Sequence, residues 1–220
     1  MMLILPTFPA KAFEYPWVFL IPNSSSYDST GNNMDEAVSR NTVAILNQKE
    51  PLFNHHLIWK KVTIKNLLSM GTPFCEMHFD AVIPCKLDSE EKSIIEEYLK
   101  RGGFILLVID TCRYSEEEYW NVKEWPIMNF LTHDLPASDH SFSTGKASEN
   151  FPIFRLPYQF TFPDFIRHEF SENPYSPVHT QLFYQNRLCC FVLEFYSSAR
   201  NRRDNAYQLL VNIYTYSVMN

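Results

Sequence analysis

The feature that most constrains the fold is a helix that runs through two glycines into a long apolar strand, at residues 88–109. Asp88 and Glu91 stand three residues apart, which is the spacing of a reciprocal capping box at a helix N-terminus. Apolar residues then recur at helical spacing as far as Leu99, with charged residues between them. Gly102 suits the left-handed residue that ends many helices. The pattern predicts a helix that begins after Asp88 and ends before Gly102.

The strand after this helix indicates the kind of sheet. Residues 104–109 (FILLVI) are all apolar and show no alternation, which is typical of a strand covered on both faces. The apolar run FDAVIP at 79–84 reads as the preceding strand. Strand, helix and buried strand in close succession form a βαβ unit with parallel strands. The predicted fold class is therefore α/β with a mostly parallel central sheet.

The flanking segments extend the α/β pattern in both directions. No linker or internal repeat divides the chain, so we expect an N-terminal arm at 1–14 and one α/β domain at 15–220. Other elements are expected as follows: strands at 15–22 and 58–62 (the second an edge strand, for its two lysines), a helix at 34–48, a helix within 116–131 broken by Pro126, short strands at 151–154 and 159–162, a hairpin of 180–184 and 188–196, and a helix at 205–218.

Composition excludes several classes of protein. Apolar residues make up 45% and charged residues 20% of the chain, which is an ordinary balance for a folded domain. The net charge is −6 and no basic stripe is present, so we expect no nucleic-acid partner. No apolar run is long enough to span a membrane. No glycine-rich phosphate loop occurs, and no cofactor is expected.

The N-terminus has two interpretations. Residues 1–4 are apolar, and Ala10-Lys11-Ala12 has the small-x-small form of a signal-peptidase site. The segment is then the remnant of a signal peptide, and the protein is exported. Alternatively it is an irregular arm of a cytoplasmic protein, which the missing basic region and the short apolar run favour.

Several segments together resemble a bacterial, commonly exported family of domains of unknown function. They are FDAVIP, LDSEEKSIIEEYLKRGGFILLVID and the closing AYQLLVNIYTYSV, while RNTVAIL and PIFRLPYQF fit the same order. The resemblance covers the chain from about Tyr15 onward. It implies the flavodoxin-like, three-layer fold of class I glutamine amidotransferases, a C-terminal hairpin and helix, and an exported, periplasmic location. It implies no established activity.

The residues after the central strand are the first candidate site, because ligands gather at the carboxyl ends of parallel strands. They are Asp110, Thr111, Cys112 and Arg113. In amidotransferases this strand leads to a sharp turn around a nucleophilic cysteine. Here Asp110 occupies the turn position, no glycine flanks it or Cys112, and no H-x-E sequence is present to supply a histidine base. Cysteine-dependent amide hydrolysis is therefore disfavoured.

Asp110 is the strongest single candidate for a functional residue, as a ligand-binding or catalytic carboxylate. Cys112 is the other catalytic candidate, while Thr111 and Arg113 are candidates for ligand binding. The alternative is structural. Asp110 then caps the following turn with help from Thr111, and Arg113 pairs with a neighbouring glutamate at the surface.

A second group of candidates lies around the first loop and helix, where flavodoxin-like folds often bind ligands. Asn33, Arg40 and Asn41 are candidate ligand-binding residues. Their ordinary roles are helix capping for the asparagines and a solvated position for Arg40.

Metal and disulfide chemistry receive little support. The seven histidines show no metal-ligand spacing, the five cysteines form no C-x-x-C pair, and no metal site is expected. Cys189 and Cys190 stand within an apolar strand, which favours a packing role. A bridge between Cys75 and Cys85 stays open, since it requires an oxidising compartment.

Two functions follow from these residues. The first is a non-catalytic binding or accessory domain of the cell envelope, with a protein or carbohydrate partner. The aromatic-rich stretch 151–184 either lines such a binding surface or, as is more common, packs back on the sheet. The second function is a hydrolase that uses Asp110, with or without a metal.

Overall fold

Seven strands form one mixed sheet in the order β2-β1-β3-β4-β7-β6-β5. The structure is a computed structural model. It describes residues 13–22, 32–49, 55–79, 87–110, 126–145, 151–155, 157–159, 181–195 and 203–219. Neighbouring strands from β2 to β7 run parallel, whereas β6 and β5 continue the sheet antiparallel. The bounds are β1 Phe13–Ile21, β2 His55–Thr63, β3 Phe74–Phe79, β4 Phe104–Asp110, β5 Phe142–Gly145, β6 Gln181–Tyr184 and β7 Arg187–Phe195.

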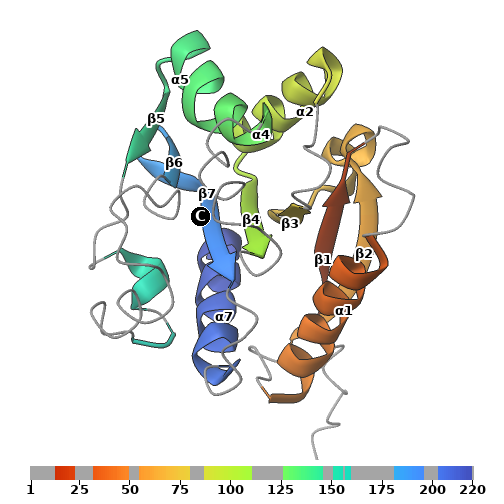
Figure 1. Cartoon of the computed structure of the whole chain (residues 1–220). Coiled ribbons are helices and arrows are strands. Elements are labelled where there is room, and N and C mark those ends of the chain that lie inside the picture. Colours follow the sequence, from red (N-terminus) through yellow and green to blue (C-terminus); the bar gives the residue numbers. More distant parts are fainter. Residues whose placement is uncertain are drawn as a thin grey trace, which may run out of the picture.

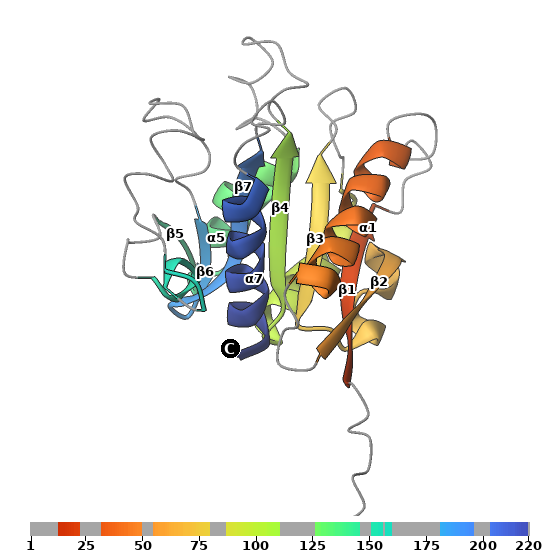
Figure 2. The ribbon, with the colours of Figure 1, turned by 90° about the horizontal axis from the view of Figure 1, so that it is seen from below.

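Helices cover both faces of the sheet, so the predicted α/β class is confirmed. Figures 1 and 2 show α1 and α7 on one face and α2, α4 and α5 on the other. The helix bounds are α1 Asn32–Lys49, α2 Ser89–Lys100, α4 Pro126–Asn129, the π-helical turn η7 Phe130–Asp134, α5 Leu135–Ser138 and α7 Arg203–Met219, with short 3-10 turns η3 Ile64–Asn66, η4 Leu68–Met70 and η8 Pro152–Phe154.

The βαβ unit β3–α2–β4 is present, and its helix carries the predicted caps. The Glu91 backbone N–H donates to the Asp88 carboxylate (2.8 Å), and the Asp88 N–H donates to the Glu91 carboxylate (2.9 Å). Gly102 has a φ of +100°, a left-handed value that glycine adopts without strain. At Gly103 the constraint is space, because an added Cβ would lie 2.4 Å from the Tyr98 ring. The two glycines thus serve different purposes.

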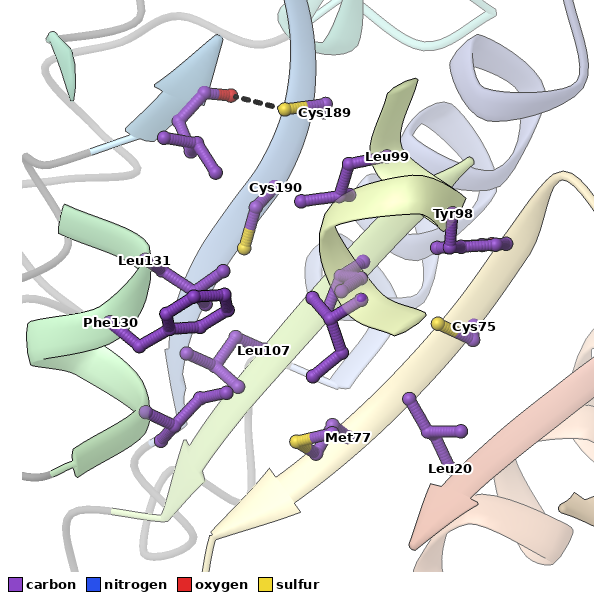
Figure 3. Close-up of a cluster of buried hydrophobic side chains, with 14 of the residues drawn as sticks. Leu20, Cys75, Met77, Tyr98, Leu99, Leu107, Phe130, Leu131, Cys189 and Cys190 are labelled. Atoms are coloured by element: carbon purple, nitrogen blue, oxygen red, sulfur yellow. Dashed lines mark hydrogen bonds between the residues drawn. The ribbon is translucent and has the colours of Figure 1, made fainter. Parts of the chain in front are cut away.

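The core forms two layers, one on each face of the sheet. Figure 3 shows the layer under α2 and the α4–α5 segment, where Cys75 and Cys190 pack among leucines and the Tyr98 ring. The other layer lies under α1 and α7 and is rich in aromatic residues. There the Trp17 ring stacks on the Tyr214 ring, with centroids 5.6 Å apart. Because β3 and β4 contribute side chains to both layers, their faces alternate between the two.

Several predicted elements keep their place. β1, α1, the hairpin of β6 and β7, and α7 confirm the expected elements within a few residues at either end. The hairpin turns at Gln185 and Asn186, both with positive φ. β2 forms one edge of the sheet, as its two lysines predicted.

Two element predictions were wrong in position or type, and a third is tested only in part. The strand before α2 is described at Phe74–Phe79, whereas it was predicted at 79–84, and residues 80–86 fall outside the described residues. Pro126 is the first described residue of α4, where a proline leaves no N–H unpaired, and the part of the predicted helix before Pro126 lies outside the described residues. The 151–154 segment is the 3-10 turn η8, which Pro152 begins. The edge strand β5 was not predicted, and the strand expected at 159–162 lies almost wholly outside the described residues.

The described beginning of the aromatic-rich stretch packs on the protein itself. The buried Asn212 of α7 donates to the carbonyls of Ile153 (2.9 Å) and Tyr158 (2.7 Å) and accepts from the Tyr158 N–H (2.9 Å). Phe151 makes ring contacts with Phe183 and Tyr216, 5.9 and 5.5 Å between centroids. For this segment, the packing interpretation is confirmed.

Candidate functional site

The carboxyl ends of the parallel strands β1, β3, β4 and β7 define one side of the sheet, which we call the carboxyl edge. Figure 2 shows the ends of β3, β4 and β7 side by side at the top of the view. Asp110 is the last residue of β4 and stands beside Phe195 of β7. The backbone of Asp110 therefore lies where the sequence predicted. Thr111, Cys112 and Arg113 lie outside the described residues, so their roles stay predictions.

The second group of candidates lies on α1. Asn33 is in the first turn, and Asn41 is exposed further along the helix. Arg40 pairs with Glu36, 2.5 Å from Nη2 to Oε1, and its guanidinium carbon lies 4.3 Å from the Trp59 ring centroid. Because the Arg40 side chain is 58% exposed, it takes the solvated position that was the ordinary alternative for it.

A buried polar cluster lies between α1 and the sheet, and it was not among the predicted sites. We call it the Glu76 cluster; its members are Trp17 of β1, Ser39 of α1, Trp59 of β2, and Glu76 and His78 of β3. Glu76 and His78 are 3% and 8% exposed, so the two ionisable groups stand almost wholly out of solvent. Since they are two residues apart on one strand, their side chains share a face of the sheet.

The Glu76 carboxylate accepts hydrogen bonds from three elements. One oxygen, Oε2, accepts from the Trp17 indole N–H (2.5 Å) and from the Ser39 hydroxyl (2.6 Å). The other, Oε1, is bonded to Nε2 of His78. The Ser39 hydroxyl also accepts from the Trp59 indole N–H (3.0 Å), which adds β2 to the network. One carboxylate thus joins a helix to three neighbouring strands.

The electrostatics of the cluster favour an ionised Glu76. Burial by itself raises the pKa of the Glu76 carboxyl, because the charged form loses its hydration. The positive charge of His78 and the hydrogen bonds from His78, Ser39 and Trp17 oppose this effect, and together they hold the pKa below its ordinary value. The ionised carboxylate requires its His78 partner to donate, so Nε2 of the imidazole carries a hydrogen.

The chemistry open to this cluster is limited by its geometry. Ser39 is fully buried, and its hydroxyl is bonded to Glu76 rather than to an imidazole base, so it does not form a nucleophile–base pair. His78 stands nearer the carboxyl edge, with Val108 as its neighbour in β4, two residues before Asp110. The cluster therefore orients one imidazole close to the edge where Asp110 lies.

The described cysteines are unsuited to nucleophilic chemistry. Cys75, Cys189 and Cys190 are free thiols, each at most 1% exposed. Burial raises the pKa of Cys75 and of Cys189 to about 12, and it also raises that of Cys190. The Cys189 thiol donates to the carbonyl of Leu182 (3.4 Å; Figure 3). Because Cys75 is a free thiol, the bridge to Cys85 that the sequence left open is not formed.

A small pocket of about 220 Å³ lies at the opposite edge of the sheet, where β3 and β4 begin. Gly71, Arg101 and the two glycines after α2 contribute to its lining. Arg101 forms an ion pair with Glu97 at the surface (2.7 Å). Its side chain therefore provides no buried charge inside the pocket. This pocket is separate from the carboxyl edge.

Searches for metal sites and membrane spans give negative results within the described residues. There, no group of three or more His, Cys, Asp or Glu side chains is placed to hold a metal ion. Among the helices of the same part of the chain, none combines the length and apolar character needed to cross a bilayer.

No protein-family model matches this chain, and a search of curated proteins finds no relative. The family resemblance therefore continues to rest on the short motifs that carry it, and it stays a prediction.

The sequence does contain one signal for the missed cluster. Glu76-Met77-His78 places two polar side chains on one face of a strand, and an apolar residue on the other. With the strand misplaced to 79–84, these residues were expected in a loop, where a glutamate and a histidine attract no notice. Their partners Trp17 and Ser39 are far away in sequence, so only the tertiary structure identifies the site.

Proposed function

We propose that this protein is a non-catalytic binding or accessory domain that engages a ligand or partner at its carboxyl edge. On this proposal the chain has the flavodoxin-like, amidotransferase-like fold that its motifs resemble, but it lacks the Cys-His-Glu machinery. A place in the cell envelope follows from the same resemblance and is part of the proposal.

The observation that carries the proposal is the state of the thiols. The described cysteines are buried and hold their protons, whereas nucleophilic cysteines need a lowered pKa and access to substrate. Within the described residues, the buried Glu76–His78 pair is bonded internally, which supports a structural use of groups that an enzyme would present to substrate.

The test compares binding with turnover in one preparation. The protein is incubated with L-glutamine, p-nitrophenyl acetate, a panel of neutral and acidic oligosaccharides and a panel of peptides. We expect one panel member to shift backbone amide resonances at the ends of β3 and β4, and no ammonia or nitrophenolate above background. Asp110→Asn weakens that binding, while Gln48→Ala, an exposed position near the C-terminal end of α1, serves as a control. Turnover that Cys112→Ser abolishes contradicts the proposal.

A hydrolase that uses Asp110 is the second candidate, and one observation favours it. The register sets His78 beside Val108, two residues before Asp110, and Glu76 orients the imidazole. An imidazole whose orientation is fixed by a hydrogen bond from its own strand is suited to general acid–base work. This candidate predicts ester hydrolysis that falls to background in both Asp110→Asn and His78→Gln, and that persists in Cys112→Ser.

A further inference from the structure

We propose that the Glu76 cluster is a proton-operated tether, in which binding of one proton by the Glu76 carboxylate releases α1 from the sheet. This goes beyond the proposed function, since it concerns the attachment of a helix and requires no ligand.

The tether depends on the fact that the partners of Glu76 are donors. The Trp17 indole can only donate, and Nε2 of His78 donates to an ionised carboxylate. When the carboxylate takes up a proton from solvent, the hydrogen bonds from Trp17 and Ser39 no longer go to a charged acceptor and become weaker. The attraction between the Glu76 and His78 charges is lost as well, so the pair gains one net positive charge inside the core. Neutralising one member of a buried ion pair is costly.

Protonation of Glu76 weakens the attachment of α1 to the sheet because one of the polar contacts of this helix is made to the Glu76 carboxylate. Ser39 is the buried polar group of α1 that reaches the carboxylate, and its hydroxyl also receives the Trp59 N–H of β2. A second polar contact involves Asn47, whose amide donates to the Leu57 carbonyl and accepts from the Leu57 N–H, both at 2.9 Å. This contact carries no charge. Among the polar contacts of α1 with the sheet, the Glu76 contact in the core and the Glu36–Lys61 pair at the rim therefore depend on protons, whereas the Asn47 contact does not.

The other charged groups around the cluster lie at its outer rim. Glu36 and Arg40 of α1 pair with each other, and Glu36 also meets Lys61 of β2 at 3.0 Å. The Lys61 hydrogen bond is the main cause that lowers the pKa of Glu36. From α7, the Tyr214 ring stacks on Trp17, and burial raises the pKa of its hydroxyl, which stays neutral. From β4, the neighbours of Glu76 and His78 in the register are the apolar Leu106 and Val108.

The sign of the pH dependence follows from Glu76. Its folded-state pKa lies below the ordinary value of 4.5, which stands for the unfolded chain. The contribution of the ionised carboxylate is therefore complete above that ordinary value and is lost as pH falls through the folded-state pKa. Acidification, and not alkalinisation, loosens α1 through this group.

Helix α1 also carries the candidate ligand residues Arg40 and Asn41. A change in its attachment therefore changes the presentation of these two side chains, and acid release would act on any ligand they contact.

Hydrogen exchange tests the tether. Amide protection of α1 is measured against that of α7 between about pH 7 and about pH 3, after correction for intrinsic rates. In the natural protein we expect the ratio of α1 to α7 protection to fall about tenfold on acidification, the size expected for the loss of one charged hydrogen bond. Glu76→Gln imitates the protonated state and is studied in a Glu36→Gln background, which removes the titrating Glu36–Lys61 pair; it should then show the low ratio at every pH. Asn47→Ala should lower the ratio throughout and keep the natural pH dependence.

Two results overturn the proposal. One is loss of protection by α1 and α7 together in the natural protein; the other is that, in the Glu36→Gln background, the pH dependence is the same with and without Glu76→Gln. A second measurement serves if that variant does not fold. The carboxyl carbon of Glu76 in the natural protein is titrated by NMR, and its midpoint must coincide with that of the α1 amide shifts, whereas separate midpoints reject the tether. Neither measurement uses a ligand. The tether and the proposed binding function can therefore fail independently of each other.

Discussion

At the scale of single residues, Glu76 and His78 are two ionisable groups buried side by side in the described core. Each ion alone would be costly to bury, and their mutual attraction with three hydrogen bonds offsets that cost. Such a pair contributes less to stability than its contacts suggest, because apolar residues of similar size often serve as well. Removal of either partner alone, however, strongly lowers the free energy of unfolding.

This leads to a prediction about paired substitutions. His78→Leu leaves a buried carboxylate without its counter-ion and should lower the free energy of unfolding by about 3–5 kcal/mol. Glu76→Leu should cost a similar amount. The double variant should be more stable than either single variant, since no unpaired charge remains. Urea unfolding at neutral pH measures all three, and a double variant less stable than both singles would reject the ion-pair interpretation.

Gly103 offers a second prediction, because its constraint is space rather than backbone angle. An alanine Cβ there would lie 2.4 Å from the Tyr98 ring, whose hydroxyl is bonded to the Phe104 backbone. We expect Gly103→Ala to cost about 1–3 kcal/mol through overpacking. Gly71→Ala is the matched control: its site has a φ of +58° and no atom within 4 Å, so only backbone strain of about 1 kcal/mol applies. Equal costs in urea unfolding would contradict the steric argument.

At the scale of elements, the end of α2 is fixed by the hairpin of β6 and β7. The Arg187 guanidinium donates to the carbonyl of Leu99 (2.6 Å) and to those of Gly102 and Gly103 (both 3.2 Å). A cation at this end of a helix also meets the negative end of its dipole. The helix that the sequence identified most clearly is thus capped at its N-terminus by its own residues, and at its C-terminus by a distant strand.

We therefore predict that Arg187→Ala lowers the free energy of unfolding by about 1.5–3 kcal/mol, the range for hydrogen bonds to a charged group. Arg187→Lys should recover only part of this loss, because a lysine cannot form the forked contact. Chemical denaturation gives both values. Full stability of the lysine variant would show that charge alone, and not the fork, holds the end of α2.

The contrast between the two ends of α2 shows what could be predicted. The capping box at Asp88 and the left-handed Gly102 depend on neighbouring residues, and both were predicted correctly. The contact of Arg187 joins residues 84 to 88 positions apart, and sequence order gives no access to it. β3 was misplaced for a related reason. Glu76 and His78 interrupt its apolar pattern, and only their distant donors make their burial possible.

The same limit applies to the candidate site. Asp110 was placed correctly at the end of β4, because the strand before it is a continuous apolar run. The Glu76 cluster was missed, because it is assembled from α1, β1, β2 and β3. The surface position of Arg40 matched its ordinary alternative, while the cation–π contact with Trp59 again joins separate elements.

At the scale of the whole molecule, the sheet separates two kinds of environment. On one face, the apolar layer contains the three described thiols, Cys75, Cys189 and Cys190. The other face carries the Glu76 cluster under α1. Both faces are closed by helices (Figures 1 and 2), so neither set of groups is presented to solvent. The carboxyl edge, where Asp110 ends the central strand, is the remaining place in this architecture where parallel strands usually bind ligands.

The central claim is that the three described thiols are packing residues and not nucleophiles, and alkylation tests it most directly. The native protein is treated with iodoacetamide at about pH 8, below the raised thiol pKa values, and each cysteine is then assigned by peptide mass spectrometry. We predict that Cys75, Cys189 and Cys190 stay unmodified until the protein is unfolded in guanidinium chloride, after which all three react. Modification of any of them in the native protein at the rate of a free thiol would contradict the claim.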